Sequence, residues 1–189
     1  MTDDIAERVL SFWFAPPGPD GRIPKREEWF KRTDAFDAVI AEQFGAECAR
    51  ALAGDLDPLM ETPAGCLALI ILLDQFPRNI FRGSPRAFAS DAKARQVTRH
   101  VLERGFDQGM DAVQRIFLYL PLEHSEDMAD QDRMVELSET LGDDNYVDYA
   151  VRHRDIIARF GRFPHRNATL GRESTAEEVT FLEGPNSSF

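Results

Sequence analysis

Apolar residues return every three or four positions along most of the chain, the spacing that places them on one face of an α-helix. No stretch shows the alternation of apolar and polar residues that is typical of a half-buried strand. The sequence therefore predicts an all-α bundle of about eight helices. These cover residues 3–14, Thr33 or Asp34 to Gly54, Thr62 to Phe76, Ser84 to Gly105, 111–120, Ser125 to Gly142, 145–160 and Thr175 to Leu182.

Several of these helices carry signals at their ends. Thr62 followed by Pro63 is typical of an N-cap and the first helical position. Thr175 with Glu178 three residues later predicts a capping box. Gly54 predicts a left-handed residue that ends its helix.

One predicted helix, over residues 62–76, is apolar on every face, so we expect it to be the central buried helix. A buried strand is a second interpretation, which is disfavoured because only Ile70 and Ile71 in the apolar run are β-branched. Pro77 prevents the helix from continuing normally, because proline lacks a backbone N–H and restricts the residue before it.

Two loop segments that join helices repeat one pattern of polar residues. The first corner, residues 72–86, contains Phe-Pro-Arg-Asn at positions 76–79, and the second corner, residues 158–175, contains Phe-Pro-His-Arg-Asn at positions 163–167. Each corner combines a proline with arginine and asparagine side chains. We therefore take the two corners as the best candidates for a functional site.

Length and composition bound the architecture. A chain of 189 residues with 43% hydrophobic content can bury one substantial core, so residues 1–189 are expected to form a single domain. The tail after the last predicted helix, residues 184–189, is expected to be loose.

The formal net charge of -11 argues against nucleic acid as a partner, because cations that neutralise phosphates drive such binding. The charge is distributed unevenly: residues 122–148 carry ten acidic residues and one arginine, whereas residues 152–172 carry six arginines and one aspartate. In one interpretation the two segments neutralise each other across a helix interface. In the other, the basic segment forms a cationic pocket.

The first residues, the short apolar runs and the cysteines together predict a cytoplasmic chain. The first ten residues carry acids where a secretory signal needs basic residues, and no apolar run approaches the roughly 20 residues that span a bilayer. Cys48 and Cys66 lie in apolar helical surroundings and have no partner at metal-ligand or redox spacing.

Four passages of the sequence resemble a known bacterial family. They are FWF at 12–14, LDQFPRNIFRG at 73–83, YLPLEHSED at 119–127, and RFGRFPHRN at 159–167 followed by LGREST at 170–175. Together they are similar to the family catalogued as domain of unknown function 924, over nearly the full chain. The resemblance implies a tetratricopeptide-like bundle of antiparallel helix pairs. It implies no reaction, so no catalytic residue is carried over from it.

The polar residues of the corners allow two interpretations. Arginine and asparagine beside a helix end can bond its last carbonyl groups and pair with a carboxylate such as Asp74, which would be a structural role. Alternatively, a planar guanidinium matches a carboxylate or a phosphate of a ligand. The predicted ligand-binding residues are Arg78, Asn79, Arg82, His165, Arg166, Asn167 and Arg172.

Glu123 and His124 follow Pro121, where we expect a helix to be interrupted. A histidine beside carboxylates can be a general base, a metal ligand or a hydrogen-bonded structural residue. The spacing of the histidines matches no metal motif, and no glycine-rich phosphate loop occurs, so we predict neither a metal nor a cofactor. His153 is interpreted as a satisfied core histidine on the apolar face of its helix.

The functional hypothesis is that both corners and residues 123–126 converge on a polar pocket for a small anion or a peptide carboxylate. Glu123 and His124 would be the acid–base pair of a hydrolase or lyase if the pocket performs chemistry. The alternative is a tetratricopeptide-like interaction module in which the arginine clusters are structural. The sequence leaves the oligomeric state open.

Overall fold

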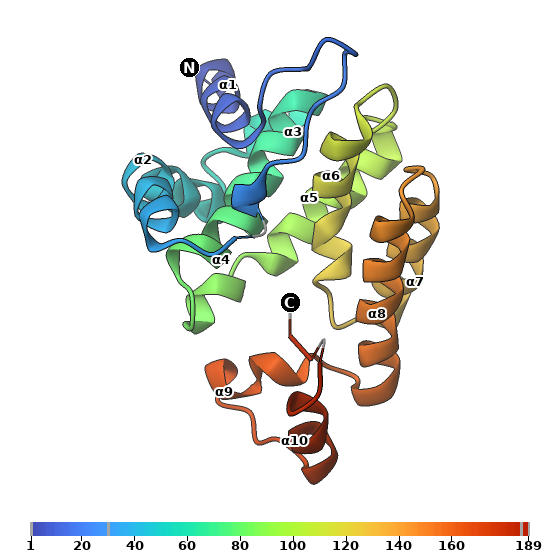
Figure 1. Ribbon diagram of the computed structural model, residues 1–189. Helices are drawn as coiled ribbons and strands as arrows, with labels where there is room; N and C mark the ends of the chain where they lie inside the picture. The colour runs from blue at the N-terminus through green and yellow to red at the C-terminus, as the bar shows by residue number, and fades with distance from the viewer. Residues whose placement is uncertain (1, 30, 186, 189) are drawn as a thin grey trace. The chain divides into compact units, whose positions relative to one another are not determined.

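The computed structural model describes residues 2–29, 31–185 and 187–188, and within these ranges it contains helices and no strand (Figure 1). The predicted all-α class is confirmed. The chain divides into two compact units: unit 1 comprises Met1–Arg82 with Arg86–Pro121, and unit 2 comprises Gly83–Pro85 with Leu122–Phe189. The prediction of a single domain over 1–189 stays a prediction. Part of the predicted loose tail, residues 186 and 189, lies outside the described residues.

Unit 1 holds the first six helices. They are α1 (Thr2–Trp13), α2 (Asp34–Ala53), α3 (Pro63–Ile70), α4 (Phe76–Ile80), α5 (Asp91–Arg104) and α6 (Ala112–Glu123), whose last two residues belong to unit 2. Short 3₁₀ turns occupy Glu27–Trp29, Asp57–Glu61 and Pro85–Phe88, of which the last begins at Pro85 of unit 2. Residues 66–73 are fully buried, so this stretch is the central apolar element of unit 1, as predicted.

Regular α-helical geometry is interrupted before Pro77 and resumes in α4, which contains Pro77. A π-helical segment, Ile71–Gln75, joins α3 to α4, and its last hydrogen bond runs from the Phe76 N–H to the Ile71 carbonyl. Pro77 has no N–H to offer the Leu73 carbonyl four residues earlier. The Ser90 hydroxyl donates to that carbonyl instead, at 2.5 Å. A donor from another segment thus allows the helix to pass through a proline.

Two other predicted boundaries are wrong. Pro121 does not interrupt its helix, because α6 continues to Glu123. The segment from Ser84 forms a 3₁₀ turn, and α5 begins only at Asp91. The hydroxyl of Ser90, directly before α5, bonds the Leu73 carbonyl and makes no cap for the helix that follows.

The predicted caps are present where the capping residue and its partner lie close in sequence. Thr62 accepts a hydrogen bond from the Gly65 N–H at 3.1 Å, and Gly54 ends α2 with φ at 97°. The capping box of Thr175 and Glu178 is present. These predictions are confirmed.

Unit 2 contains α7 (Met128–Glu139), α8 (Asp144–Phe160), a 3₁₀ turn (Pro164–Arg166), α9 (Asn167–Leu170) and α10 (Ala176–Leu182). Helices α7 and α8 pack side by side and are joined by a short turn (Figure 1). Ile156, Ile157 and Phe163 form a buried cluster, against which Phe160 and Phe181 pack. Asp127 caps α7, because its carboxylate accepts the Ala129 N–H at 2.9 Å, so the predicted cap at Ser125 is wrong.

In the part of the chain that the structure describes, none of the helices combines the length and the apolar character that crossing a membrane requires.

Candidate functional site

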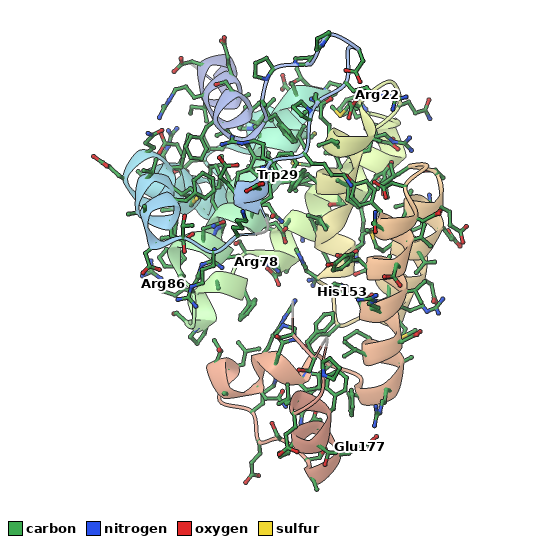
Figure 2. The ribbon with its side chains drawn as sticks, viewed as in Figure 1. Arg22, Trp29, Arg78, Arg86, His153 and Glu177 are labelled. Atoms are coloured by element: carbon green, nitrogen blue, oxygen red, sulfur yellow. The ribbon has the colours of Figure 1, made fainter. Side chains whose placement is uncertain are left out.

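The first corner lies in unit 1, apart from Gly83–Pro85, and its Arg78 and Arg82 bind carboxylates of the same unit. Arg78 donates to both oxygens of Asp91, at 3.0 and 3.1 Å, and its Nη1 lies 3.1 Å from the Asp74 carboxylate. Figure 2 shows Arg78 at α4. Burial alone would lower the pKa of Arg78, but the two carboxylates raise it above its ordinary value.

Asn79 and Arg82 share a third carboxylate. Asp37 of α2 accepts a hydrogen bond from Asn79 at 2.7 Å and two from Arg82, at 2.5 and 3.1 Å. Burial acts to raise the pKa of Asp37, and the hydrogen bonds from Arg82 and Asn79 outweigh it and lower the pKa. These contacts join α4 to α2, which is the structural role considered for the corner.

The second corner belongs to unit 2, and Phe163 lies at its centre. The Arg166 guanidinium carbon is 4.4 Å from the centroid of the Phe163 ring. The rings of His153 and His165 each lie 5.6 Å from the same ring, measured between centroids. Arg166 also donates to the His124 carbonyl at 3.0 Å. Residues distant in sequence are thereby gathered around one phenylalanine.

Glu126 and Arg172 make a bidentate ion pair in this corner. Arg172 donates through Nη1 to Oε2 of Glu126 at 2.7 Å and through Nη2 to Oε1 at 3.0 Å. The same Oε1 accepts the backbone N–H of Phe163 at 2.8 Å. Burial acts to raise the pKa of Glu126, but these donors and the charges of Arg172 and Arg166 lower it. Glu126 is therefore ionised at neutral pH.

We call this arrangement the histidine–arginine cluster. It consists of His124, His153, His165, Arg166 and Arg172, arranged around Phe163 and Glu126. His124 and His165 are half-buried, whereas His153 and Arg166 are buried.

The buried imidazole of His153 is neutral and its tautomer is fixed. Its Nδ1 lies 2.8 Å from the carbonyl of Tyr149, which can only accept, so Nδ1 carries the proton. Burial lowers the pKa of His153 to about 3, and the charges of His124, Arg166 and His165 act in the same direction. Figure 2 shows His153 on α8. The prediction that His153 is a satisfied core histidine agrees with its burial and its hydrogen bond.

His165 is neutral for related reasons. Burial lowers its pKa to about 4, with further contributions from Arg166, His124 and Arg172, and only Glu126 acts to raise it. The guanidinium groups thus create a positive potential at the His165 ring.

Glu123, predicted as half of an acid–base pair, is buried at the end of α6. Its Oε1 lies 3.7 Å from Nδ1 of His153. The side-chain amide of Gln131 holds this helix end, because it donates to the carbonyls of Glu123 and Ser125, at 2.7 Å each. The catalytic role of Glu123 and His124 stays a prediction.

Asn167 and Arg162 connect the corner to α10. Asn167 is buried and donates to the Ser174 hydroxyl at 3.0 Å. Arg162 donates to both oxygens of Glu178, at 2.6 and 2.8 Å, and this pair is the main reason that the pKa of Glu178 falls to about 2. Carboxylates of two segments therefore pair with arginines of residues 152–172. Arg172 pairs with a carboxylate of residues 122–148, and Arg162 pairs with a carboxylate of α10.

The two corners belong to different compact units, so the prediction that they line one pocket stays a prediction. Within unit 2, residues 123–126 and the second corner do come together. Among the described residues, no three histidine, cysteine or acidic side chains are grouped so that they could hold a metal ion.

Sequence reasoning placed Glu126 in the segment 123–126 of the predicted pocket without giving it a role of its own, and it assigned no site role to Phe163 or His153. Phe163 and His153 read as core residues, and both are buried. The signal that could have identified Glu126 is its position one residue before the helix cap Asp127, in a connection that carries Glu123 and His124.

Comparison with known proteins places the chain in a family. The family model "Bacterial protein of unknown function (DUF924)" matches residues 9–186. The chain belongs to this family. A protein of unknown function from Agrobacterium tumefaciens, whose structure is solved, is 42% identical to this chain, with a TM-score of 0.88 over 97% of this chain and 100% of that chain. No curated protein matches the chain. The resemblance read from the four sequence passages is confirmed, and neither description supplies a reaction.

Proposed function

We propose that this DUF924 protein binds a small anion at the histidine–arginine cluster of unit 2. The observation that carries the proposal is the gathering of two half-buried imidazoles, His124 and His165, beside the guanidiniums of Arg166 and Arg172. Guanidinium and imidazolium groups are the side chains that bind carboxylates and phosphates with charge-assisted hydrogen bonds.

The neutral state of His165 gives such a site a defined pH dependence. An anion next to the ring would favour the protonated imidazole, which offers two N–H donors in place of one. Binding would therefore take up a proton. Because the pKa of His165 without ligand is about 4, affinity is expected to rise as the pH falls from 7.5 toward 5.

Acetate and sulfate are suitable probes, because both keep their charge between pH 6 and 7.5. We expect saturable shifts of the His124 and His165 ring signals in NMR titrations, with tighter binding at pH 6. The ring of His100, which lies in unit 1 and contacts the Met60 carbonyl at 3.0 Å, serves as the internal control. Sodium chloride at equal ionic strength controls for screening.

Arg166→Gln removes the buried cation and should abolish the saturable response, whereas Arg166→Lys should retain part of it. Far-UV circular dichroism establishes that each variant is folded. The proposal fails if acetate and sulfate shift the His124 and His165 signals no more than sodium chloride does.

A second candidate function, the helical interaction module, is supported by a different observation. Arg78, Arg82 and Arg172 each bind a carboxylate of their own unit, which is what structural arginines do. In that case the cluster would not respond to anions, and charge reversal on an exposed helix face would remove partners in a pull-down.

A further inference from the structure

The carboxylate of Glu126 is held as a bound carboxylate ligand would be. Two guanidinium nitrogens of Arg172 face its two oxygens, at 2.7 and 3.0 Å, and the Phe163 N–H adds a third donor at 2.8 Å. The charge of the buried Arg166 guanidinium also lowers the pKa of Glu126. A paired guanidinium with a backbone N–H is a common way to recognise a planar carboxylate.

The Glu126–Arg172 pair is reached by solvent. Its side chain is 29% exposed, and that of Arg172 is 23% exposed. Because both side chains reach solvent, water and dissolved anions can compete with each partner for the other. An external carboxylate can therefore compete with Glu126 for the same donors.

The backbone around Glu126 is fixed, so only its side chain would have to rotate. Gln131 donates to the Ser125 carbonyl at 2.7 Å, and the Ser125 hydroxyl donates to Asp130 at 2.7 Å. Asp127 begins α7 as its cap. The donors of Arg172 and Phe163 would thus remain in place when Glu126 moves out.

We propose that Glu126 is an internal competitor that occupies the place of a ligand carboxylate, so the anion taken by this site is a carboxylate that exchanges with the Glu126 side chain. The inference rests on the proposed function and specifies its ligand class. The arrangement also explains why an arginine in a ligand site is already paired: the pair holds the guanidinium in orientation while the site is empty.

Glu126→Gln tests this exchange. Glutamine keeps the size and the acceptor oxygen but loses the negative charge, so it competes less well for Arg172. We expect the variant to bind acetate about tenfold more tightly than the wild type, by the histidine NMR titration. Sulfate, which is tetrahedral, should gain less than acetate.

Glu177→Gln is the matched control. Glu177 pairs with Arg159 at 2.9 Å, and its side chain is 61% exposed, so the variant removes the same charge from another arginine pair of unit 2. Its acetate affinity should stay within about twofold of the wild type, because an exposed charge outside the cluster is screened by solvent.

The outcomes separate the two proposals. Saturable binding in the wild type with no gain in Glu126→Gln overturns the exchange and leaves the anion site standing. Equal gains in Glu126→Gln and Glu177→Gln reduce the effect to net charge and also overturn the exchange. Absence of any saturable response, in the wild type and in both variants, overturns the anion site and the exchange together.

Discussion

At the scale of single residues, the environment decides what a histidine does. His153 and His165 have the same intrinsic chemistry, yet burial and neighbouring guanidiniums keep both neutral well below the ordinary pKa of 6.5. The sequence could show that His153 lies on an apolar helix face. It could not show that Arg166 and the rings of His124 and His165 lie close to it, because these residues are distant from His153 in the sequence.

The buried neutral state of His153 should make the protein sensitive to mild acid. In the unfolded chain the imidazole binds a proton near pH 6.5, whereas in the native state it does so only near pH 3. The unfolded state thus binds more protons between these values, and stability falls as the pH is lowered through this window. The loss from His153 alone at pH 5 is about 2 kcal/mol relative to pH 7.5.

His153→Gln checks this value. Glutamine can still donate to the Tyr149 carbonyl but does not titrate. Urea unfolding at pH 7.5 and pH 5 should show a pH-dependent difference smaller by about 2 kcal/mol in the variant. The range above pH 5 is chosen because the carboxylates with lowered pKa, such as Glu126 and Glu178, lose their stabilising charge only below about pH 4.5. A variant with the full pH dependence of the wild type would contradict the assignment.

At the scale of helices, predictions succeed where the deciding groups are close in sequence. The Thr62 cap and the Thr175–Glu178 box involve residues three positions apart, and both are present. Pro77 is the opposite case, because its effect depends on Ser90, thirteen residues later, which bonds the Leu73 carbonyl. Asp127 and Ser125 are both plausible caps by residue type, and only geometry distinguishes them.

Ser90→Ala should expose how much the helix through Pro77 depends on that hydroxyl. The substitution leaves the buried Leu73 carbonyl without this donor, which is expected to lower the free energy of unfolding by about 1–3 kcal/mol. Chemical denaturation measures the difference. Ser11→Ala is the control, because Ser11 is exposed on α1 and its hydroxyl also donates to a carbonyl, at 3.3 Å. Equal stability of both variants would show that Leu73 finds another donor.

At the scale of the whole molecule, the limit of sequence reasoning is the pairing of distant residues. Arg82 pairs with Asp37, 45 positions away, and Arg172 pairs with Glu126, 46 positions away. The sequence predicted that arginines gather at both corners, but it could not assign their partners. The all-α class follows from local periodicity alone, which is why it could be predicted completely.

The two units contain different natural probes, so their unfolding can be followed separately. Both cysteines and both tryptophans lie in unit 1, whereas His153 and His165 lie in unit 2. Helix α6 runs without a break from one unit into the other at Pro121 and Leu122. We therefore expect tryptophan fluorescence and the histidine NMR signals to show one coincident transition in urea. Two separate midpoints would contradict the single-domain prediction.

The thiols add a kinetic measurement. Burial raises the pKa of Cys48 to about 12 and that of Cys66 to about 11, so little thiolate is present at neutral pH. The native protein should react with a thiol reagent only as fast as unit 1 opens. Rapid labelling of both cysteines without denaturant would contradict this.

The π-helical segment Ile71–Gln75 has a consequence for insertions and deletions in the chain. Such a turn holds one residue more than an α-helical turn, so everything after it is rotated by about 100° relative to a regular helix. This offset helps to bring Arg78 toward Asp91 and Asn79 toward Asp37 while Phe76 remains in the core. Deleting one residue from this segment would restore the regular α-helical phase and rotate the Arg78 guanidinium away from its carboxylates. We therefore expect the segment to tolerate substitution far better than deletion.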